Sequence, residues 1–135
     1  MTIEEIKKKV AKFWEAFNNG DLDGQLALMS ENATYTIMGN TPISGCKIGK
    51  NEIRRHFISF GKLIGPGAVM KTRRLIAESD IVVCLSEGNM FGRTGKIYNN
   101  QYVFVFQFAN DEIIKITEYL DTELIETSIY GKSLS

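Results

Sequence analysis

The chain has 135 residues, which is enough for one domain with a substantial core and too few for two. Sixteen Lys and Arg residues balance sixteen Asp and Glu residues, so the charge favours neither a nucleic acid nor a membrane as partner. The composition, 44% hydrophobic and 24% charged, is ordinary for a globular protein. We therefore expect a single domain over residues 1–135, with no nucleic-acid or membrane partner.

The cysteines and the single histidine limit the chemistry further. Cys46 and Cys84 have neither the spacing of a metal site nor that of a redox motif. The N-terminal residues lack the apolar stretch of a signal peptide. Isolated cysteines in such a chain are typical of free thiols in a reducing compartment. We expect a cytoplasmic protein with no metal and no cofactor.

Helical periodicity marks the N-terminal half. Apolar residues recur at helical spacing from Ile3 to Asn19, where Thr2 followed by Glu5 forms a capping box. Asp21 can cap a second, short helix that runs through Met29. A third helix is predicted from Lys50 to Ile64, with an apolar stripe along one face.

Alternating apolar and polar residues predict strands in the remaining segments. A short strand is expected over Ala33–Met38, followed by a loop over Gly39–Gly45. Thr122–Tyr130 is predicted as a closing helix. Four strands with short connections, which favour antiparallel hairpins, are expected over 68–79, 81–91, 96–108 and 113–121.

This order of elements predicts an α+β fold. Strands grouped after helices favour a strongly curved antiparallel sheet, with the three helices of the N-terminal half packed on its concave face. Such a layered cone commonly holds a ligand pocket at its wide end. We expect a pocket between the helices and the sheet.

Glu118 is the most informative residue of the sequence. The last predicted strand alternates Ile114, Ile116, Glu118 and Leu120 on one face, so a carboxylate stands where a hydrophobe is expected. A buried, unpaired charge is costly, so such a group is paired, protonated or turned toward a cavity. The functional interpretation is a general acid/base with a raised pKa; the structural one is an ion pair, with Arg73 or Arg74 as candidates.

Asp121 is a second catalytic candidate at the end of the same strand. It precedes Thr122 and can cap the closing helix, which is its simpler role. It also falls on the face opposite Glu118 unless a bulge shifts the register.

Other side chains are expected to line the pocket and bind the substrate. Tyr35 has a hydroxyl on a strand beneath the helices, and Tyr102 and Asn100 share a face near the mouth. His56 is expected at the surface, with a pocket acid/base as the minor alternative. The predicted substrate-binding residues are Trp14, Tyr35, Phe57, Asn100, Tyr102 and Leu120.

The opposite face of the fourth strand, with Val103, Val105 and Gln107, would lie on the convex side of the sheet. A flat apolar patch at that position favours a homodimer formed sheet to sheet.

Several short segments resemble the nuclear-transport-factor-2-like superfamily, specifically its SnoaL-like branch of polyketide cyclases and ketosteroid-isomerase relatives. These segments are Phe17–Asp23, Gly49–Ile53, Gly95–Tyr102 and Glu118–Thr122. The resemblance covers nearly the whole chain and implies the cone-shaped fold. It does not by itself define the reaction, because this fold hosts many functions.

Comparison with enzymes of this superfamily restricts the reaction. Where ketosteroid isomerases have a tyrosine donor this chain has Phe13, and where they have an aspartate base it has Thr36 or Ile37. Limonene-epoxide hydrolases match at Glu118 and Tyr35, but Ile37 replaces their Asn and no clear Arg-x-Asp follows. Polyketide cyclases need an acidic residue near the end of the last strand, which Glu118 or Asp121 could supply.

The sequence thus predicts a protein that binds a small apolar, carbonyl-bearing molecule. As an enzyme it would be a cofactor-independent isomerase, cyclase or lyase in which Glu118 moves a proton next to the carbonyl. Tyr35, Asn100 and Tyr102 would then donate hydrogen bonds to a developing enolate oxygen. The alternative is a ligand-binding or dimeric assembly module without catalysis.

Overall fold

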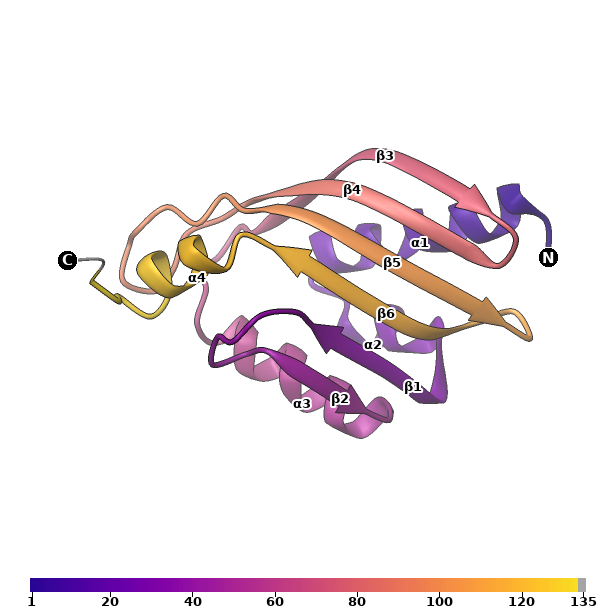
Figure 1. Ribbon diagram of the computed structural model, residues 1–135, viewed down its shortest axis with the longest axis horizontal. Coiled ribbons are helices and arrows are strands. Elements are labelled where there is room, and N and C mark those ends of the chain that lie inside the picture. Colours follow the sequence, from indigo (N-terminus) through magenta and orange to yellow (C-terminus); the bar gives the residue numbers. More distant parts are fainter. Residues whose placement is uncertain (134–135) are drawn as a thin grey trace.

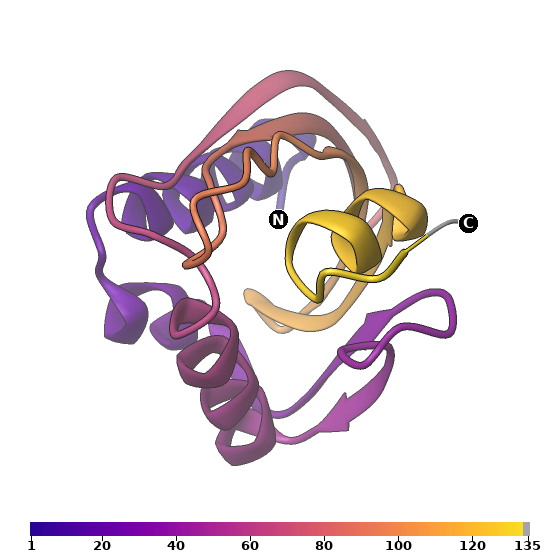
Figure 2. The same cartoon turned by 90° about the vertical axis from the view of Figure 1, so that its left-hand side faces the viewer.

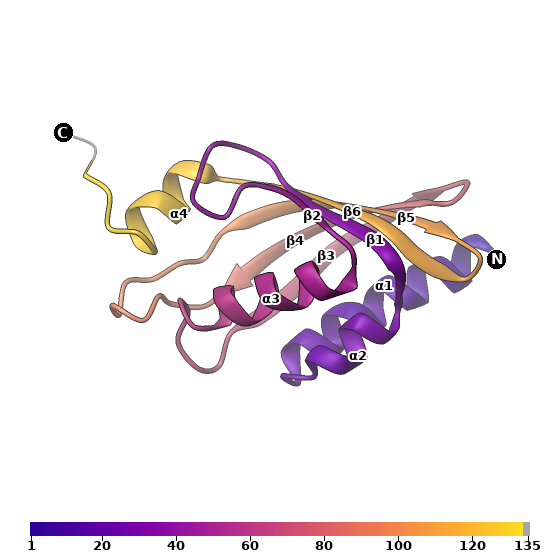
Figure 3. The ribbon, with the colours of Figure 1, turned by 90° about the horizontal axis from the view of Figure 1, so that it is seen from below.

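The computed structural model describes residues 1–133 and has the predicted α+β architecture. Three helices, α1 (Ile3–Asn18), α2 (Leu22–Ala27) and α3 (Lys50–Gly61), lie on one side of a sheet (Figure 3). Six strands form that sheet: β1 (Met29–Ile37), β2 (Gly45–Ile48), β3 (Val69–Glu78), β4 (Ile81–Asn89), β5 (Gln101–Ala109) and β6 (Glu112–Leu120). A fourth helix, α4 (Thr122–Ser128), covers one end of the molecule (Figure 2).

The sheet order is β2-β1-β6-β5-β4-β3, and strands β3 to β6 form the expected antiparallel meander. The sheet is mixed, however, because β1 pairs with β6 in parallel; both arrows point to the same end in Figure 1. Alternation along a strand specifies its two faces but not its neighbours, so the sequence did not predict this pairing.

Several predicted elements differ from the structure, and the third helix ends at Gly61 rather than Ile64. After the predicted loop, the unpredicted strand β2 pairs antiparallel with β1. The first strand begins at Met29, inside the range assigned to the second helix. The fourth predicted strand begins at Gln101 rather than Lys96, because the segment before it forms only an isolated bridge between Phe91 and Ile97.

Local sequence explains where the helices begin and where the strands turn. Thr2 accepts a hydrogen bond from the backbone N–H of Glu5 at the start of α1, and Asp21 caps α2 in the same way. Asn110 and Asp111 both have positive φ, which matches the type I′ turn of a two-residue hairpin.

A bulge changes the faces of β6. Gln107 pairs with Lys115, whereas the next residue, Phe108, pairs with Ile113, so one extra residue sits in β6. Ile113 is therefore fully buried and Ile114 is not, which corrects the predicted alternation at that end of the strand. From Ile116 onward the predicted parity holds, and Glu118 points to the helices.

The core lies between the helices and the concave face of the sheet. Its centre is aromatic: Phe13 and Trp14 of α1 contact Phe104 and Phe106 of β5 with ring centroids 4.6–6.2 Å apart. Among the described helices, none has the length and apolar character that crossing a membrane requires.

Candidate functional site

A cavity of about 280 Å³ lies between the helices and the concave face of the sheet. Its walls are mainly aromatic and aliphatic, with Phe13, Phe17 and Phe60 from the helices and Met70 and Met90 from the strand side. Five side chains add polar groups: Gln25, Tyr35, His56, Tyr102 and Glu118. An apolar cavity with a few polar groups is the usual form of a small-molecule site.

Glu118 of β6 faces this cavity and is only 8% exposed. The hydroxyl of Tyr35, on the parallel neighbour β1, donates a 2.5 Å hydrogen bond to Oε1. Oε2 accepts no hydrogen bond from any residue in the described part of the chain. The expected partners do not reach it, since Arg73 forms its ion pair with Glu87. Glu118 thus keeps one oxygen for a ligand.

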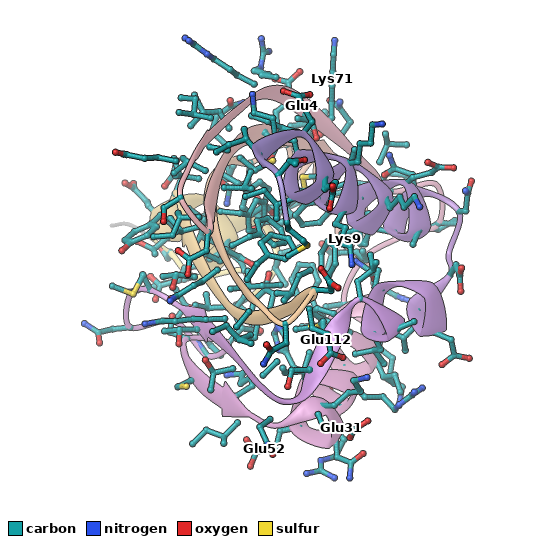
Figure 4. All side chains as sticks on the ribbon, turned by 90° about the vertical axis from the view of Figure 1, so that its right-hand side faces the viewer. Glu4, Lys9, Glu31, Glu52, Lys71 and Glu112 are labelled. Atoms are coloured by element: carbon teal, nitrogen blue, oxygen red, sulfur yellow. The ribbon has the colours of Figure 1, made fainter. Side chains whose placement is uncertain are left out.

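The surroundings of Glu118 place its pKa in the range useful for acid–base chemistry. Burial raises the pKa of the carboxyl from 4.5 to about 7, while the Tyr35 hydrogen bond and the charge of Lys47 act in the opposite direction. A general base works best with a pKa near the ambient pH. The exposed carboxylates Glu4, Glu31, Glu52 and Glu112 in Figure 4 lie on the outside of the molecule, in water.

His56 of α3 is partly exposed, as expected, and it also lines the cavity. Its ring packs near Tyr35, Phe57 and Phe60, with centroid separations of 5.8–6.5 Å. Burial, followed by the charge of Lys47, lowers the pKa of His56 from 6.5 to about 4. The imidazole is therefore neutral near pH 7, and none of the described side chains hydrogen-bonds to it.

Five residues proposed from the sequence come together at this cavity: Trp14, Tyr35, Phe57, Tyr102 and Glu118. The hydroxyl of Tyr102 donates to the Tyr98 oxygen at 3.2 Å, so its proton is engaged with the protein. Burial raises the pKa of both phenols, that of Tyr98 to about 12.

Asn100, Leu120 and Asp121 lie outside the cavity lining. Asn100 is fully buried, and its amide donates to the Tyr98 hydroxyl and the Asp121 carbonyl at 2.9 and 3.0 Å. Its oxygen accepts from the backbone N–H groups of Gln101 and Asp121. The carboxylate of Asp121 accepts from Leu124 N–H and caps α4. Asn100 and Asp121 thus stabilise the start of β5, the end of β6 and the start of α4.

Gln25 is a pocket residue that the sequence analysis missed. It is 4% exposed and lies on α2 with Leu22 and Leu26 at helical spacing. A polar residue on an apolar helix face is the same kind of exception that identified Glu118 on an apolar strand face. That exception was available in the sequence.

No group of three or more His, Cys, Asp and Glu side chains within residues 1–133 is arranged to hold a metal ion. The polar groups of the cavity are instead a carboxyl, a phenol, an imidazole and an amide. These groups donate, accept and transfer protons.

The fold and cavity define a small α+β protein in which a curved sheet and three helices enclose a site with one buried carboxyl. Residues 10–119 match the family model described as a SnoaL-like domain, and the chain belongs to this family. The family resemblance inferred from the sequence is confirmed.

Solved structures share the fold over nearly the whole chain. An NTF2-like protein from Burkholderia pseudomallei is 20% identical with a TM-score of 0.86, covering 96% of this chain and 98% of its own. A candidate isomerase from Bacillus subtilis is 18% identical with a TM-score of 0.86 over 100% of both chains. TerC, co-crystallised with polyporic acid, is 18% identical with a TM-score of 0.84, over 93% of this chain and 98% of TerC. Comparison with curated proteins gave no match.

Proposed function

We propose that this protein binds a small apolar, carbonyl-bearing molecule and moves a proton at the carbon next to the carbonyl. It would act without a cofactor, as an isomerase, cyclase or lyase. The observation that carries the proposal is Glu118, a buried carboxyl whose Oε2 is free inside an apolar cavity. Positioned proton transfer of this kind typically contributes ~10²–10⁴-fold in rate.

The proton transfer can be written with the groups present. The ionised Glu118 takes the proton from the α-carbon, and the electron pair of the C–H bond moves to the carbonyl oxygen, giving an enolate. The neutral His56 donates a hydrogen bond to that oxygen, as a preorganised donor for the developing charge. When a C=C bond adjoins the α-carbon, the enolate is a dienolate, and Glu118 returns the proton to the far carbon of that bond, which gives the conjugated isomer. In a cyclisation the enolate carbon attacks a second carbonyl, and the resulting alkoxide takes the proton.

Tyr35 has the role of positioning Glu118 rather than contacting the reacting carbon. Its hydroxyl occupies Oε1 and leaves Oε2 as the oxygen that receives the proton. Burial, followed by the charge of Glu118, raises the pKa of Tyr35 well above its ordinary value, so the phenol remains a donor at every working pH. Asn100 and Tyr102 were expected to donate hydrogen bonds to the enolate oxygen, but both already donate to other groups of the protein. We assign this role to His56 instead.

The structural neighbours support the proposal as precedents for the fold. One is a candidate isomerase and another was co-crystallised with polyporic acid, a small organic ligand. At 18% identity these neighbours are evidence for the fold alone, and the proposed reaction rests on Glu118.

The test uses 2-tetralone, an apolar ketone with acidic α-hydrogens, in deuterated buffer. We expect the protein to accelerate exchange of the α-hydrogens, as followed by NMR, and Glu118→Gln to reduce the catalysed rate by about 10²-fold or more. Glu112→Gln, which changes an exposed carboxylate on the same strand, is the matched control and should leave the rate unchanged.

Equal catalysed rates for wild type and Glu118→Gln would remove Glu118 from the mechanism. Binding of 2-tetralone without any accelerated exchange would contradict catalysis and support the non-catalytic ligand-binding role. Binding is measured independently by the fluorescence of Trp14, the sole tryptophan of the chain, which lines the cavity.

We also propose that two copies associate through the outer face of the sheet, which is turned to the viewer in Figure 1. Cross-strand registers place Ile76, Val83 and Val105 in one row and Leu85, Val103 and Tyr119 in the next. Ile76, Val103 and Tyr119 are 36–45% exposed. A contiguous apolar patch of this kind supports a self-complementary interface. A single-chain mass in solution at micromolar concentration would contradict the dimer.

For the location, we propose the cytoplasm. Cys46 is exposed and Cys84 is buried, and both are free thiols. An exposed free thiol supports a reducing compartment. Rapid disulfide-linked dimer formation through Cys46 under oxidising conditions, absent with reductant, is the expected behaviour in vitro.

A further inference from the structure

Gln25 carries a polar group that the protein itself does not use. The residue is 4% exposed and lines the cavity. No described residue hydrogen-bonds its side-chain amide. Buried amides are nearly always paired, because leaving one unpaired forfeits its solvation. A buried amide turned into a cavity therefore points to a partner that is not part of the chain.

The structure of α2 gives no other reason for a glutamine here. Asp21 already caps the helix, with its carboxylate on Gly24 N–H and its carbonyl on Gln25 N–H. Leu22 and Leu26 on the same face pack against the core. A leucine at position 25 would continue this apolar face without an unpaired group, so the amide is not explained by folding.

We propose that Gln25 is a specificity-determining residue that hydrogen-bonds a second oxygen function of the ligand, a hydroxyl group. This inference rests on the proposed function, since it concerns the molecule that Glu118 acts on. An amide has both donors and an acceptor, and a hydroxyl is the group that uses both at once.

The position of Gln25 relative to Glu118 defines the general form of the ligand. Glu118 lies on β6 of the sheet, whereas Gln25 lies on α2 in the helical layer on one side of that sheet (Figure 3), and both residues line the cavity. The walls between them are apolar, with Phe13, Phe57 and Phe104 among them. The ligand is therefore an apolar skeleton that places the α-carbon of its carbonyl group at Glu118 and a hydroxyl group toward the helices. A cavity of about 280 Å³ suits a two-ring skeleton.

The experiment compares 6-hydroxy-2-tetralone with 6-methyl-2-tetralone, which has similar size and lacks the second oxygen. Affinities are measured through Trp14 fluorescence and by calorimetry. We expect wild type to bind the hydroxy compound about tenfold more tightly, because the hydroxyl satisfies the unpaired amide. Gln25→Leu should lose or reverse this preference, whereas Gln107→Leu, the same change on the outer face of β5, should keep it.

A second measurement separates ligand recognition from a structural role. Since Gln25→Leu removes an unpaired buried amide, its thermal unfolding temperature should equal or exceed that of wild type. A marked fall in that temperature would overturn the proposal, as would equal binding of the two compounds by wild type or an unchanged preference in Gln25→Leu.

The two proposals fail separately. A tenfold preference that depends on Gln25, without accelerated α-hydrogen exchange, would contradict the role of Glu118 alone. Exchange that depends on Glu118, with no preference for the hydroxy compound, would contradict the role of Gln25 alone.

Discussion

Two groups in the cavity, Glu118 and His56, respond to burial in opposite directions. Burial raises the pKa of Glu118 to about 7, so the neutral acid is favoured over the carboxylate. Burial and the charge of Lys47 lower the pKa of His56 to about 4, so the neutral imidazole is favoured over the imidazolium. Both shifts favour neutral forms, as an apolar cavity requires, and they leave Glu118 able to gain and lose a proton near pH 7.

These shifts predict opposing effects of pH on stability between about 4.5 and 6.5. In this window the folded state binds more protons than the unfolded state at Glu118, so that residue's contribution falls as pH rises. At His56 the folded state binds fewer protons, so its contribution rises with pH. Tyr35, whose pKa is raised well above its ordinary value, keeps its proton in this window, and Lys47 is the charge that acts on both groups. We expect a nearly flat profile for wild type.

Single variants should reveal each slope in chemical denaturation at pH 4.5, 5.5 and 6.5. Glu118→Gln leaves only the His56 effect, so the free energy of unfolding should increase with pH. His56→Gln leaves only the Glu118 effect, so the free energy should decrease with pH. Parallel profiles for the three proteins would mean that neither group is shifted as described.

At the residue scale the sequence predicted the buried carboxyl that faces the cavity and part of the cavity's apolar wall. Glu118, Trp14 and Phe57 were identifiable because each breaks or follows a periodic pattern. Gln25 was missed because a glutamine in a short helix is usually exposed, and only the packing of α2 against the other helices buries it. Asn100 was assigned to the pocket because it shares parity with Tyr102, but its side chain turns to the backbone of Asp121.

At the scale of elements, Asn100 joins the beginning of β5 to the end of β6. Its amide makes four hydrogen bonds, two of them to the backbone of Asp121. The Asp121 side chain in turn caps α4. One asparagine therefore fixes the strand end that follows Glu118 and the start of the closing helix.

We expect Asn100→Ala to lower the free energy of unfolding by about 2–4 kcal/mol, because three part-buried backbone groups and the buried Tyr98 hydroxyl lose their hydrogen-bond partner. Chemical denaturation measures this change. Asn51→Ala, at an exposed position of α3, is the control and should shift stability by less than about 0.5 kcal/mol. Lost ligand affinity with unchanged stability would assign Asn100 to binding instead.

The bulge in β6 is another feature of elements that residue patterns did not predict. Alternation predicted the right face for Glu118 but the wrong face for Ile114. The reason is that Ile114 is the extra residue of the bulge, between Ile113 and Lys115. A bulge leaves no distinct pattern in a run of apolar residues. The predicted faces of the residues near the site were correct, because the pairing of β6 with β5 is regular from Ile116 to Leu120.

At the scale of the whole molecule, the outer face of the sheet is the surface through which we propose that two copies associate. We expect Val103→Glu to convert the proposed dimer to a monomer, because it places a charge at the centre of the apolar patch. Light scattering at micromolar concentration measures the mass. Ile97→Glu changes a side chain that is 70% exposed and outside the sheet, and should leave the mass unchanged. If the wild-type protein is itself a monomer, or if Val103→Glu remains a dimer, the proposed interface is wrong.

The α+β class, the helices on one face and the four-strand meander could all be predicted from periodicity and turns. The parallel contact between β1 and β6 could not, because nothing in either strand encodes its neighbour. This contact nevertheless places Tyr35 beside Glu118.

The parallel pairing of β1 and β6 also has a consequence for how the protein is made. The Tyr35–Glu118 hydrogen bond joins residues 83 positions apart, so it forms only after nearly all of the chain has been synthesised. Until then β1 lacks its inner neighbour and the aromatic faces of the helices lack part of their cover. Long-range closure of this kind slows folding. A polypeptide that ends before β6 therefore lacks both Glu118 and the strand that pairs with β1.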